Sequence, residues 1–155
     1  VRAGPHAGAS QAGDPQVGDW LTVDLLLRAR SRLDEVTVGV VLRDAGGQDV
    51  FGLNSYHAGR PVTLGAAGAE RWVRFACRLE LAPGTYRIGA ALHGDQDHLG
   101  VCYHWIDRLA QIAIQPPAKT GFRGLCRLPA RLDTDAAEAP RIGAAAAATP
   151  ASKAR

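Results

Sequence analysis

Methionine is absent from all 155 residues, and several features that would assign a function directly are missing as well. Because no methionine begins the chain, we expect it to be a fragment of a longer protein. No apolar run reaches the ~18–20 residues that a membrane-spanning helix needs. Residues 1–19 are rich in Gly, Ala and Pro and lack the hydrophobic stretch of a signal peptide. The sequence therefore predicts neither a transmembrane helix nor a secretory leader.

A strong charge imbalance is also missing. The 18 basic and 15 acidic residues give a formal net charge of +3, and the two signs are interspersed. Binding to a nucleic acid needs a concentrated basic surface, so we do not expect a nucleic acid as a partner.

Cysteine is scarce. Cys77, Cys102 and Cys126 are an odd number with wide spacing, which favours a reducing compartment over a disulfide framework. Cys77 lies in phase with apolar neighbours, and we interpret it as a small buried hydrophobic residue.

Motifs of catalysis and cofactor binding are missing too. The segment GAAGAERW at 65–72 lacks the lysine of a phosphate-binding loop. Neither a dinucleotide-binding G-x-G-x-x-G nor a nucleophile elbow G-x-S-x-G occurs. Close carboxylate pairs stand at Asp95 with Asp97 and at Asp34 with Glu35, where solvated turn residues are common. We therefore predict that this chain is not an enzyme and needs no cofactor.

One segment, 93–105, does gather residue types that bind metals. Its ligand-type residues are His93, Asp95, Asp97, His98, Cys102 and His104. Zinc needs ligands that converge in a tetrahedron, and the spacing H-x4-H-x3-C-x-H matches no established pattern. We predict a polar loop without a metal, and a metal-dependent enzyme that uses this loop is the alternative.

What the sequence does contain is strand-type alternation around tight turns. In VTVGVVLR at 36–43, alternate residues are apolar, and the turn DAGG at 44–47 returns the chain into 49–56. The corner LAPGTY at 81–86 leads into another strand, and Tyr86 resembles the tyrosine corner of immunoglobulin-like folds.

This pattern predicts an all-β fold, an immunoglobulin-like antiparallel β-sandwich with flexible N- and C-terminal tails. We expect residues 1–16 to be a linker, 17–132 the sandwich, and 133–155 a disordered Ala/Pro-rich tail. For the first strand a helix is the rival interpretation. The expected strands are 20–31, 36–43, 49–56, 61–64, 70–81, 85–93, 108–115 and 122–132.

The order of these elements resembles the C-terminal carbohydrate-binding domain of Wzt-type ATPase subunits, which belong to bacterial ABC exporters of O-antigen and related polysaccharides. The residues that carry the resemblance are VGD at 17–19, VGV at 38–40, VFGLNS at 50–55, LAPGTY at 81–86, IAI at 112–114 and FRGLCRL at 122–128. VFGLNS together with LAPGTY is moderately specific. The region before Val17 departs from the family, which usually has a recognisable first strand there.

The resemblance implies a non-catalytic domain that binds an O-antigen-type polysaccharide for export, in lipopolysaccharide biosynthesis. It implies an N-terminal ATPase domain tethered through residues 1–16, a membrane permease as partner, and a place in the cytoplasm at the inner face of the bacterial inner membrane. It also implies a homodimer, in which residues 122–132 would be exchanged because Pro116-Pro117 forms a stiff hinge before them.

Strand alternation places Gly39, Gly89 and Ala91 on one face, where small side chains would leave a shallow trough. Aromatic faces and planar polar groups bind sugars, so we expect polar and aromatic residues around this trough to hold the glycan. These residues are Thr37, Asn54, Tyr56, Arg87, His93 and Gln111 from strands, with His104 and Trp105 from the adjacent loop.

Other interpretations stay open for this surface. Asn54 could instead satisfy backbone groups of a turn, and Trp72 could be a cross-strand packing partner. The small residues could also let a second subunit dock. A structural or dimerisation domain without its own ligand is therefore the alternative function.

Overall fold

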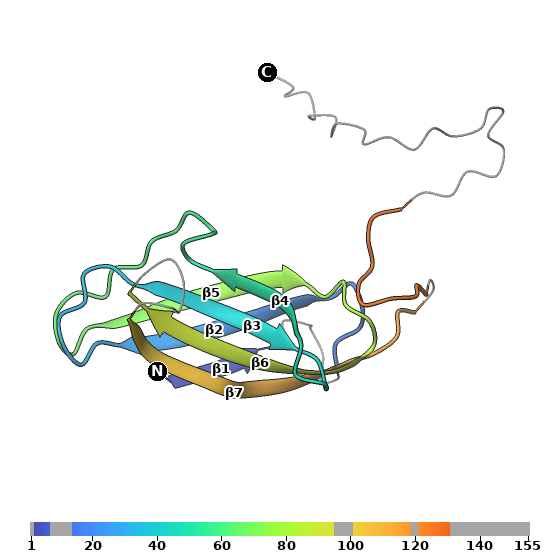
Figure 1. The fold of residues 1–155 in the computed structure, drawn as a ribbon, viewed down its shortest axis with the longest axis horizontal. Coiled ribbons are helices and arrows are strands. Elements are labelled where there is room, and N and C mark those ends of the chain that lie inside the picture. The colour runs from blue at the N-terminus through green and yellow to red at the C-terminus, as the bar shows by residue number, and fades with distance from the viewer. Residues whose placement is uncertain (1, 7–13, 95–100, 119–120, 131–155) are drawn as a thin grey trace, which may run out of the picture.

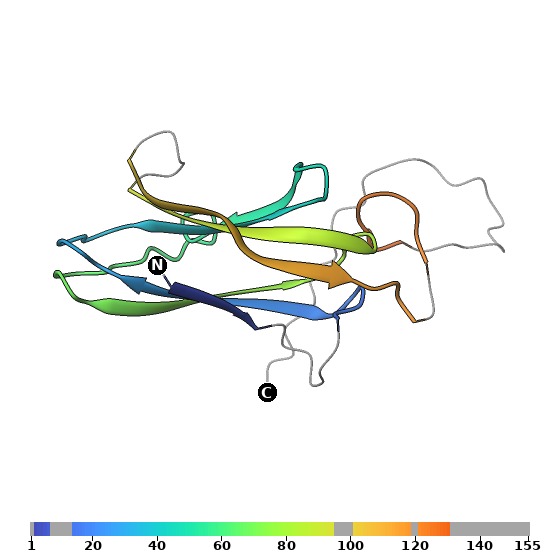
Figure 2. The ribbon, with the colours of Figure 1, turned by 90° about the horizontal axis from the view of Figure 1, so that it is seen from below.

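The computed structural model describes residues 2–6, 14–94, 101–118 and 121–130, and these residues form two antiparallel β-sheets without a helix (Figure 1). One sheet has the strand order β1-β2-β5 and the other β4-β3-β6-β7. The two sheets lie one above the other as two layers (Figure 2), which confirms the predicted all-β sandwich. The strands are β1 (Arg2–His6), β2 (Trp20–Arg28), β3 (Thr37–Arg43), β4 (Asp49–Asn54), β5 (Glu70–Arg78), β6 (Gly84–His93) and β7 (Cys102–Ile114).

The core lies between the two sheets and follows the predicted alternation. In β2 every second side chain is buried, and Leu21, Leu25 and Leu27 are each at most 1% exposed. Val38 of β3 and Ile88 of β6 meet them from the other sheet and are fully buried. The period of two in β2 confirms a strand and rejects the rival helix, because a helix would bury residues three and four apart.

Tyr86 forms the predicted tyrosine corner. Its ring is buried, and its hydroxyl donates a 2.7 Å hydrogen bond to the carbonyl of Ala82, four residues upstream. The bond fixes the corner that leads from β5 into β6.

Residues 2–6, within the segment predicted to be a linker, form β1, which pairs with β2 from Arg2 opposite Leu26 to His6 opposite Thr22. The segment has no alternation that would reveal a strand. An edge of β2 offers backbone donors and acceptors that pair whatever the side chains are, and an edge strand tolerates Pro5. The predicted tail at 133–155 lies outside the described residues.

Strand β7 is longer than predicted. It begins at Cys102, within the segment expected to be a loop, and continues for 13 residues. Its pairing with β6 shifts by two residues between Ile88 and Ala90, and this bulge breaks the alternation that sequence patterns depend on.

Two other predicted strands are single bridges instead. Val62 pairs with Val36, and Cys126 pairs with Leu81, but neither pairing extends into a strand. Residues 131 and 132, the end of the last predicted strand, lie outside the described residues. The described part of the chain contains no helix that could span a membrane.

Candidate functional site

The outer face of the four-stranded sheet has small residues at its centre and larger ones at both margins. Strand pairing sets Asn54, Gly39, Ala91 and Trp105 in one row across β4, β3, β6 and β7. Adjacent strands lie about 4.8 Å apart, so the backbones at the two ends of this row are about 14 Å apart. The centre of the row is therefore a floor, and Asn54 and Trp105 are its walls.

A hollow of ≈ 260 Å³ lies over this row, and we call it the groove. It opens on the face predicted to be a trough. Its lining residues are Gly39, Val40, Val41, Arg43, Asp49, Gly52, Leu53, Asn54, His57, Ala91, His93 and Trp105.

Glycines shape the groove in two ways. A Cβ at Gly89 would lie 3.0 Å from Cγ1 of Val41 and 3.1 Å from the carbonyl oxygen of Ile106, so the bulge of β7 requires glycine there. A Cβ at Gly52 would come no closer than 3.8 Å to its nearest neighbour, the carbonyl oxygen of Val40. Packing therefore does not require glycine at position 52, where the missing side chain leaves the groove open.

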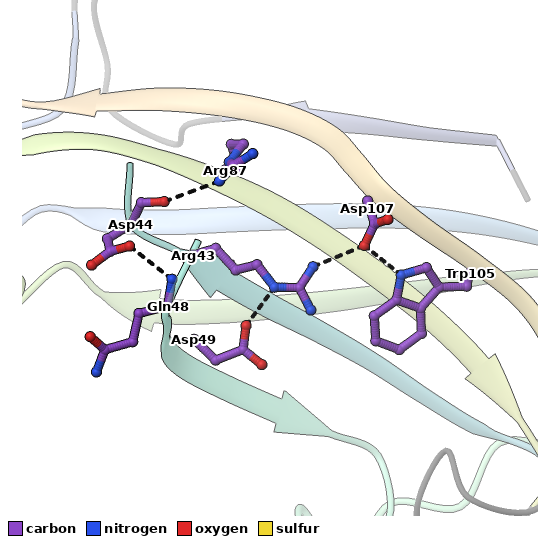
Figure 3. A network of polar contacts seen from close by, with 7 residues as sticks. All are labelled: Arg43, Asp44, Gln48, Asp49, Arg87, Trp105 and Asp107. Atoms are coloured by element: carbon purple, nitrogen blue, oxygen red, sulfur yellow. Dashed lines mark hydrogen bonds and ion pairs between the residues drawn. The ribbon is translucent and has the colours of Figure 1, made fainter. Parts of the chain in front are cut away.

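The polar end of the groove is a connected network (Figure 3). The Nε1–H of Trp105 donates a 2.6 Å hydrogen bond to Oδ1 of Asp107, and Nη1 of Arg43 donates a 3.0 Å bond to the same oxygen. Nε of Arg43 also binds Oδ1 of Asp49. The guanidinium carbon of Arg43 lies 5.6 Å from the centre of the Trp105 ring, within cation–π range. Trp105 is 41% exposed, yet these contacts fix its orientation.

Electrostatics favour the ionised forms of Arg43 and Asp107. The hydrogen bond from Trp105 and then the guanidinium of Arg43 hold the pKa of Asp107 below its ordinary value. The hydrogen bond to Asp49 is the largest cause that raises the pKa of Arg43. Arg43 with Asp49 and Asp107 thus form a charged cluster of formal charge −1 at neutral pH.

Three of the predicted sugar-contacting residues line the groove: Asn54, His93 and Trp105. Oδ1 of Asn54 accepts a 2.7 Å bond from the backbone N–H of His57, so the turn interpretation of this residue is also correct. His93 is 4% exposed and pairs with Thr37, a further predicted residue, which lies beside the groove and is 7% exposed.

Three predicted residues lie on other parts of the surface. Arg87 and Gln111 pair with each other in the row of Arg43, on the β6 and β7 side of it, and Nη2 of Arg87 lies 3.5 Å from the carbonyl oxygen of Asp44. Tyr56 lies in the turn after β4, 48% exposed and edge-on to His57. None of these three side chains is a groove lining residue among those described.

The predicted loop position of His104 is wrong. His104 belongs to β7 and not to a loop, and it pairs with Leu92, whose side chain points into the core. Paired residues share a face, so His104 points to the side opposite the groove. It lines a separate depression with Leu26 and Arg28 of β2, and partial burial lowers its pKa.

Sequence reasoning missed Arg43, Asp49, His57 and Asp107. Arg43 was in phase with Thr37, Gly39 and Val41, so alternation alone could have placed it on the groove face. The position of Asp49 on the same face follows from its pairing with Arg43 in the hairpin. Asp107 is two residues after Trp105 on the same strand, but its position was hidden because the strand was expected to begin at 108.

The residues of the alternative metal site do not converge where the structure describes them. His93 pairs with Cys102, whereas His104 points to the opposite face. No group of three or more His, Cys, Asp or Glu residues within the described ranges is arranged to hold a metal ion. Asp95, Asp97 and His98 lie outside those ranges.

Comparison with known proteins gives the family. The "Wzt C-terminal domain" family matches residues 7–128. A solved structure titled "Crystal structure of the C-terminal domain of wzt" aligns with a TM-score of 0.66 and 14% identity, over 78% of this chain and 73% of that chain. No curated protein matches the chain. At this identity the solved structure shows the shared fold, and the family match covers most of the sequence. The chain belongs to the Wzt C-terminal domain family.

Proposed function

We propose that this domain binds a bacterial cell-surface polysaccharide in the groove of its four-stranded sheet and presents it for export. Membership of the Wzt C-terminal domain family supports a role in a polysaccharide ABC exporter, and the Wzt C-terminal domain is non-catalytic. The glycan-binding step and an O-antigen-type ligand are our proposal.

The observation that carries this proposal is the fixed, exposed indole of Trp105. A flat aromatic ring packs on the C–H face of a sugar, while planar polar groups bind the hydroxyls. Asp107 and Arg43 hold Trp105 in one orientation beside a floor of small residues. Such pre-organisation lowers the entropic cost of binding a ligand.

The wider setting follows from the exporter role. We propose that an N-terminal ATPase domain and a membrane permease are the partners, and that the domain acts in the cytoplasm at the inner face of the inner membrane, in lipopolysaccharide biosynthesis. A homodimer would bring two grooves to one repeating glycan. Two weak sites on one chain gain avidity through effective concentration.

Replacing Trp105 by alanine tests the proposal. We expect Trp105→Ala to weaken binding to a glycan array of bacterial O-antigen polysaccharides by about tenfold or more, the equivalent of about 1.4 kcal/mol or more. Trp72→Ala is the matched control, because Trp72 is a 66% exposed tryptophan on β5, in the other sheet. That variant should bind like the unmodified domain.

Two results would contradict glycan binding in the groove. If both tryptophan variants bound as well as the unmodified domain, the glycan site would lie elsewhere. If the unmodified domain bound no glycan on the array, the alternative, a structural or dimerisation domain without its own ligand, would be favoured.

A further inference from the structure

Arg43 is the positively charged residue among those that line the groove, and two carboxylates already bind it. Asp49 and Asp107 contact it from opposite sides (Figure 3). The side chain of Arg43 is 19% exposed, whereas those of Asp49 and Asp107 are 60% and 69% exposed. An incoming ligand therefore meets the two carboxylates before it meets the guanidinium.

The carboxylates retain the capacity to accept further hydrogen bonds. Each uses Oδ1 for Arg43, and Asp107 uses the same atom for Trp105. Within the described residues, Oδ2 of Asp49 and Oδ2 of Asp107 accept no hydrogen bond from another residue. An ionised carboxylate is an acceptor and never a donor, so its partner must bring an O–H or N–H group. Sugar hydroxyls provide such donors.

An anionic group in this place would face like charges. A sulfate, a carboxylate or a phosphodiester has no proton to donate to the two Oδ2 atoms at neutral pH. Inorganic phosphate keeps P–OH groups, but it carries negative charge, and both carboxylates would repel any of these anions. Asp49 and Asp107 already occupy Nε and Nη1 of Arg43, so at these atoms an anion would have to displace a carboxylate. The displacement would break an existing charge-assisted bond and leave two like charges side by side.

We propose that the groove selects a glycan unit that is uncharged and rich in hydroxyls, and rejects units that carry phosphate, sulfate or carboxylate. This inference rests on the proposed glycan binding and names the class of sugar. Arg87 does not change the conclusion. It pairs directly with Arg43 across β3 and β6, but its guanidinium reaches the turn 44–47, where Nη2 lies 3.5 Å from the Asp44 carbonyl oxygen, and it is not one of the lining residues.

The charge argument is tested without knowing the glycan, by titrating the 155-residue chain with inorganic phosphate. The readout is the Trp105 indole N–H resonance, assigned through a Trp105→Phe variant. We expect no saturable shift in the unmodified chain up to 100-fold molar excess. The double variant Asp49→Asn, Asp107→Asn frees Arg43 and keeps side chains of the same shape, so it should show a saturable shift.

Asp34→Asn is the matched control. Asp34 also pairs with an arginine, Arg32, but outside the groove, so its loss removes one acidic charge and leaves Arg43 bound. The Trp105 indole N–H resonance of this variant should show no saturable shift when phosphate is added, as in the unmodified chain. A saturable phosphate shift in the unmodified chain would overturn the inference and leave glycan binding standing.

A glycan array with neutral and acidic polysaccharides gives a second measurement that needs no variant. We expect the bound glycans to be uncharged, with a preference of at least about tenfold over phosphorylated or uronic-acid glycans, since facing like charges cost several kcal/mol. Trp105-dependent binding that is confined to acidic glycans would overturn this inference but support the proposed function. Binding to none of them would overturn both.

Discussion

His93, His104 and Trp105 show how the position of a residue in the alternation of a strand decides the face to which its side chain points. His93, His104 and Trp105 were expected to bind one ligand together. His104 and Trp105 are neighbours on β7, so their side chains point to opposite faces. Because the sequence interpretation placed both in a loop, it could not apply this alternation. His93 was placed correctly at the groove because the alternation of β6 was in phase, whereas Trp105 lies there on a strand although it was expected in a loop.

Gly89 gives a prediction about stability at the residue scale. Alanine there would press its Cβ on the Ile106 carbonyl oxygen and on Val41. We expect Gly89→Ala to lower the free energy of unfolding by about 1–3 kcal/mol, the usual cost of overpacking. Urea denaturation of the variant and of the unmodified domain measures this loss of stability.

Gly52→Ala is the control for that change, because a Cβ there has room. Its stability should be unchanged or higher by roughly 0.5–1 kcal/mol, since alanine loses less conformational entropy on folding than glycine. Equal stability of the two alanine variants would mean that β7 accommodates a side chain at position 89.

Tyr86→Phe tests the tyrosine corner. The change removes the hydroxyl that bonds to the Ala82 carbonyl and keeps the buried ring. We expect a loss of about 0.5–1.5 kcal/mol in the free energy of unfolding, the net contribution of one hydrogen bond. Tyr56→Phe, at an exposed ring in a turn, should be neutral in the same denaturation experiment. A neutral Tyr86→Phe would show that the corner is held by packing alone.

At the scale of strands, regular alternation made the central elements predictable and irregular pairing hid the others. The core-facing residues of β2, β3 and β6 recur at every second position, although several residues on the outer face of β3 and β6 are buried as well. The bulge of β7 interrupts that period, so half of this strand was mistaken for a loop. Strand β1 was missed because its pairing depends on the backbone of β2 and not on a pattern of its own.

The segment 121–130 docks on the corner between β5 and β6. The backbone N–H of Arg127 donates to the carbonyl oxygen of Glu80, and the carbonyl oxygen of Leu125 accepts from the N–H of Ala82. The side chain of Arg127 also pairs with the carboxylate of Glu80. The hydrogen bond from Arg127 is the main cause that lowers the pKa of Glu80 from its ordinary value of 4.5. The docked segment therefore favours the ionised carboxylate.

This linkage predicts that docking is sensitive to acid. The stabilisation is present above pH 4.5 and is lost as the pH falls through the lowered pKa of docked Glu80, because the undocked carboxyl takes up its proton first. The amide resonance of Arg127 should move toward random-coil positions over that range. In Glu80→Gln the same resonance should lose its pH dependence below 4.5, and an unchanged titration would assign the effect to another acid.

At the scale of the whole molecule, we predict a homodimer formed by exchange of residues 122–132. In the single chain this segment docks on its own β5–β6 corner, and in the exchanged dimer it would make the same contacts on the partner. Pro116-Pro117 stands between β7 and this segment, and a stiff connection restricts the ways in which the segment can fold back, which favours exchange. Replacing both prolines by glycine should shift the population toward monomer, measured by sedimentation equilibrium. Ala118→Gly, in the same connection, should leave the dimer fraction unchanged. A monomer in all three forms would reject the exchange.

Composition and alternation sufficed for the class of fold, and the motifs that carry the resemblance sufficed for the family. Neither predicted the charged residues of the groove. A two-layer sandwich depends on hydrophobic alternation, which is local in sequence. The contact of Arg43 with Asp107 joins residues 64 positions apart and depends on the bulge of β7. Such a contact requires the register of three strands, which no single segment encodes.

The floor of the groove comes from the two inner strands of its sheet, β3 and β6, while Asn54 and Trp105 stand on the outermost strands, β4 and β7. A molecule that contacts both Asn54 and Trp105 therefore links the two outermost strands, which are otherwise connected across the sheet only through β3 and β6. A bound ligand would therefore restrict movement of the two outermost strands relative to each other.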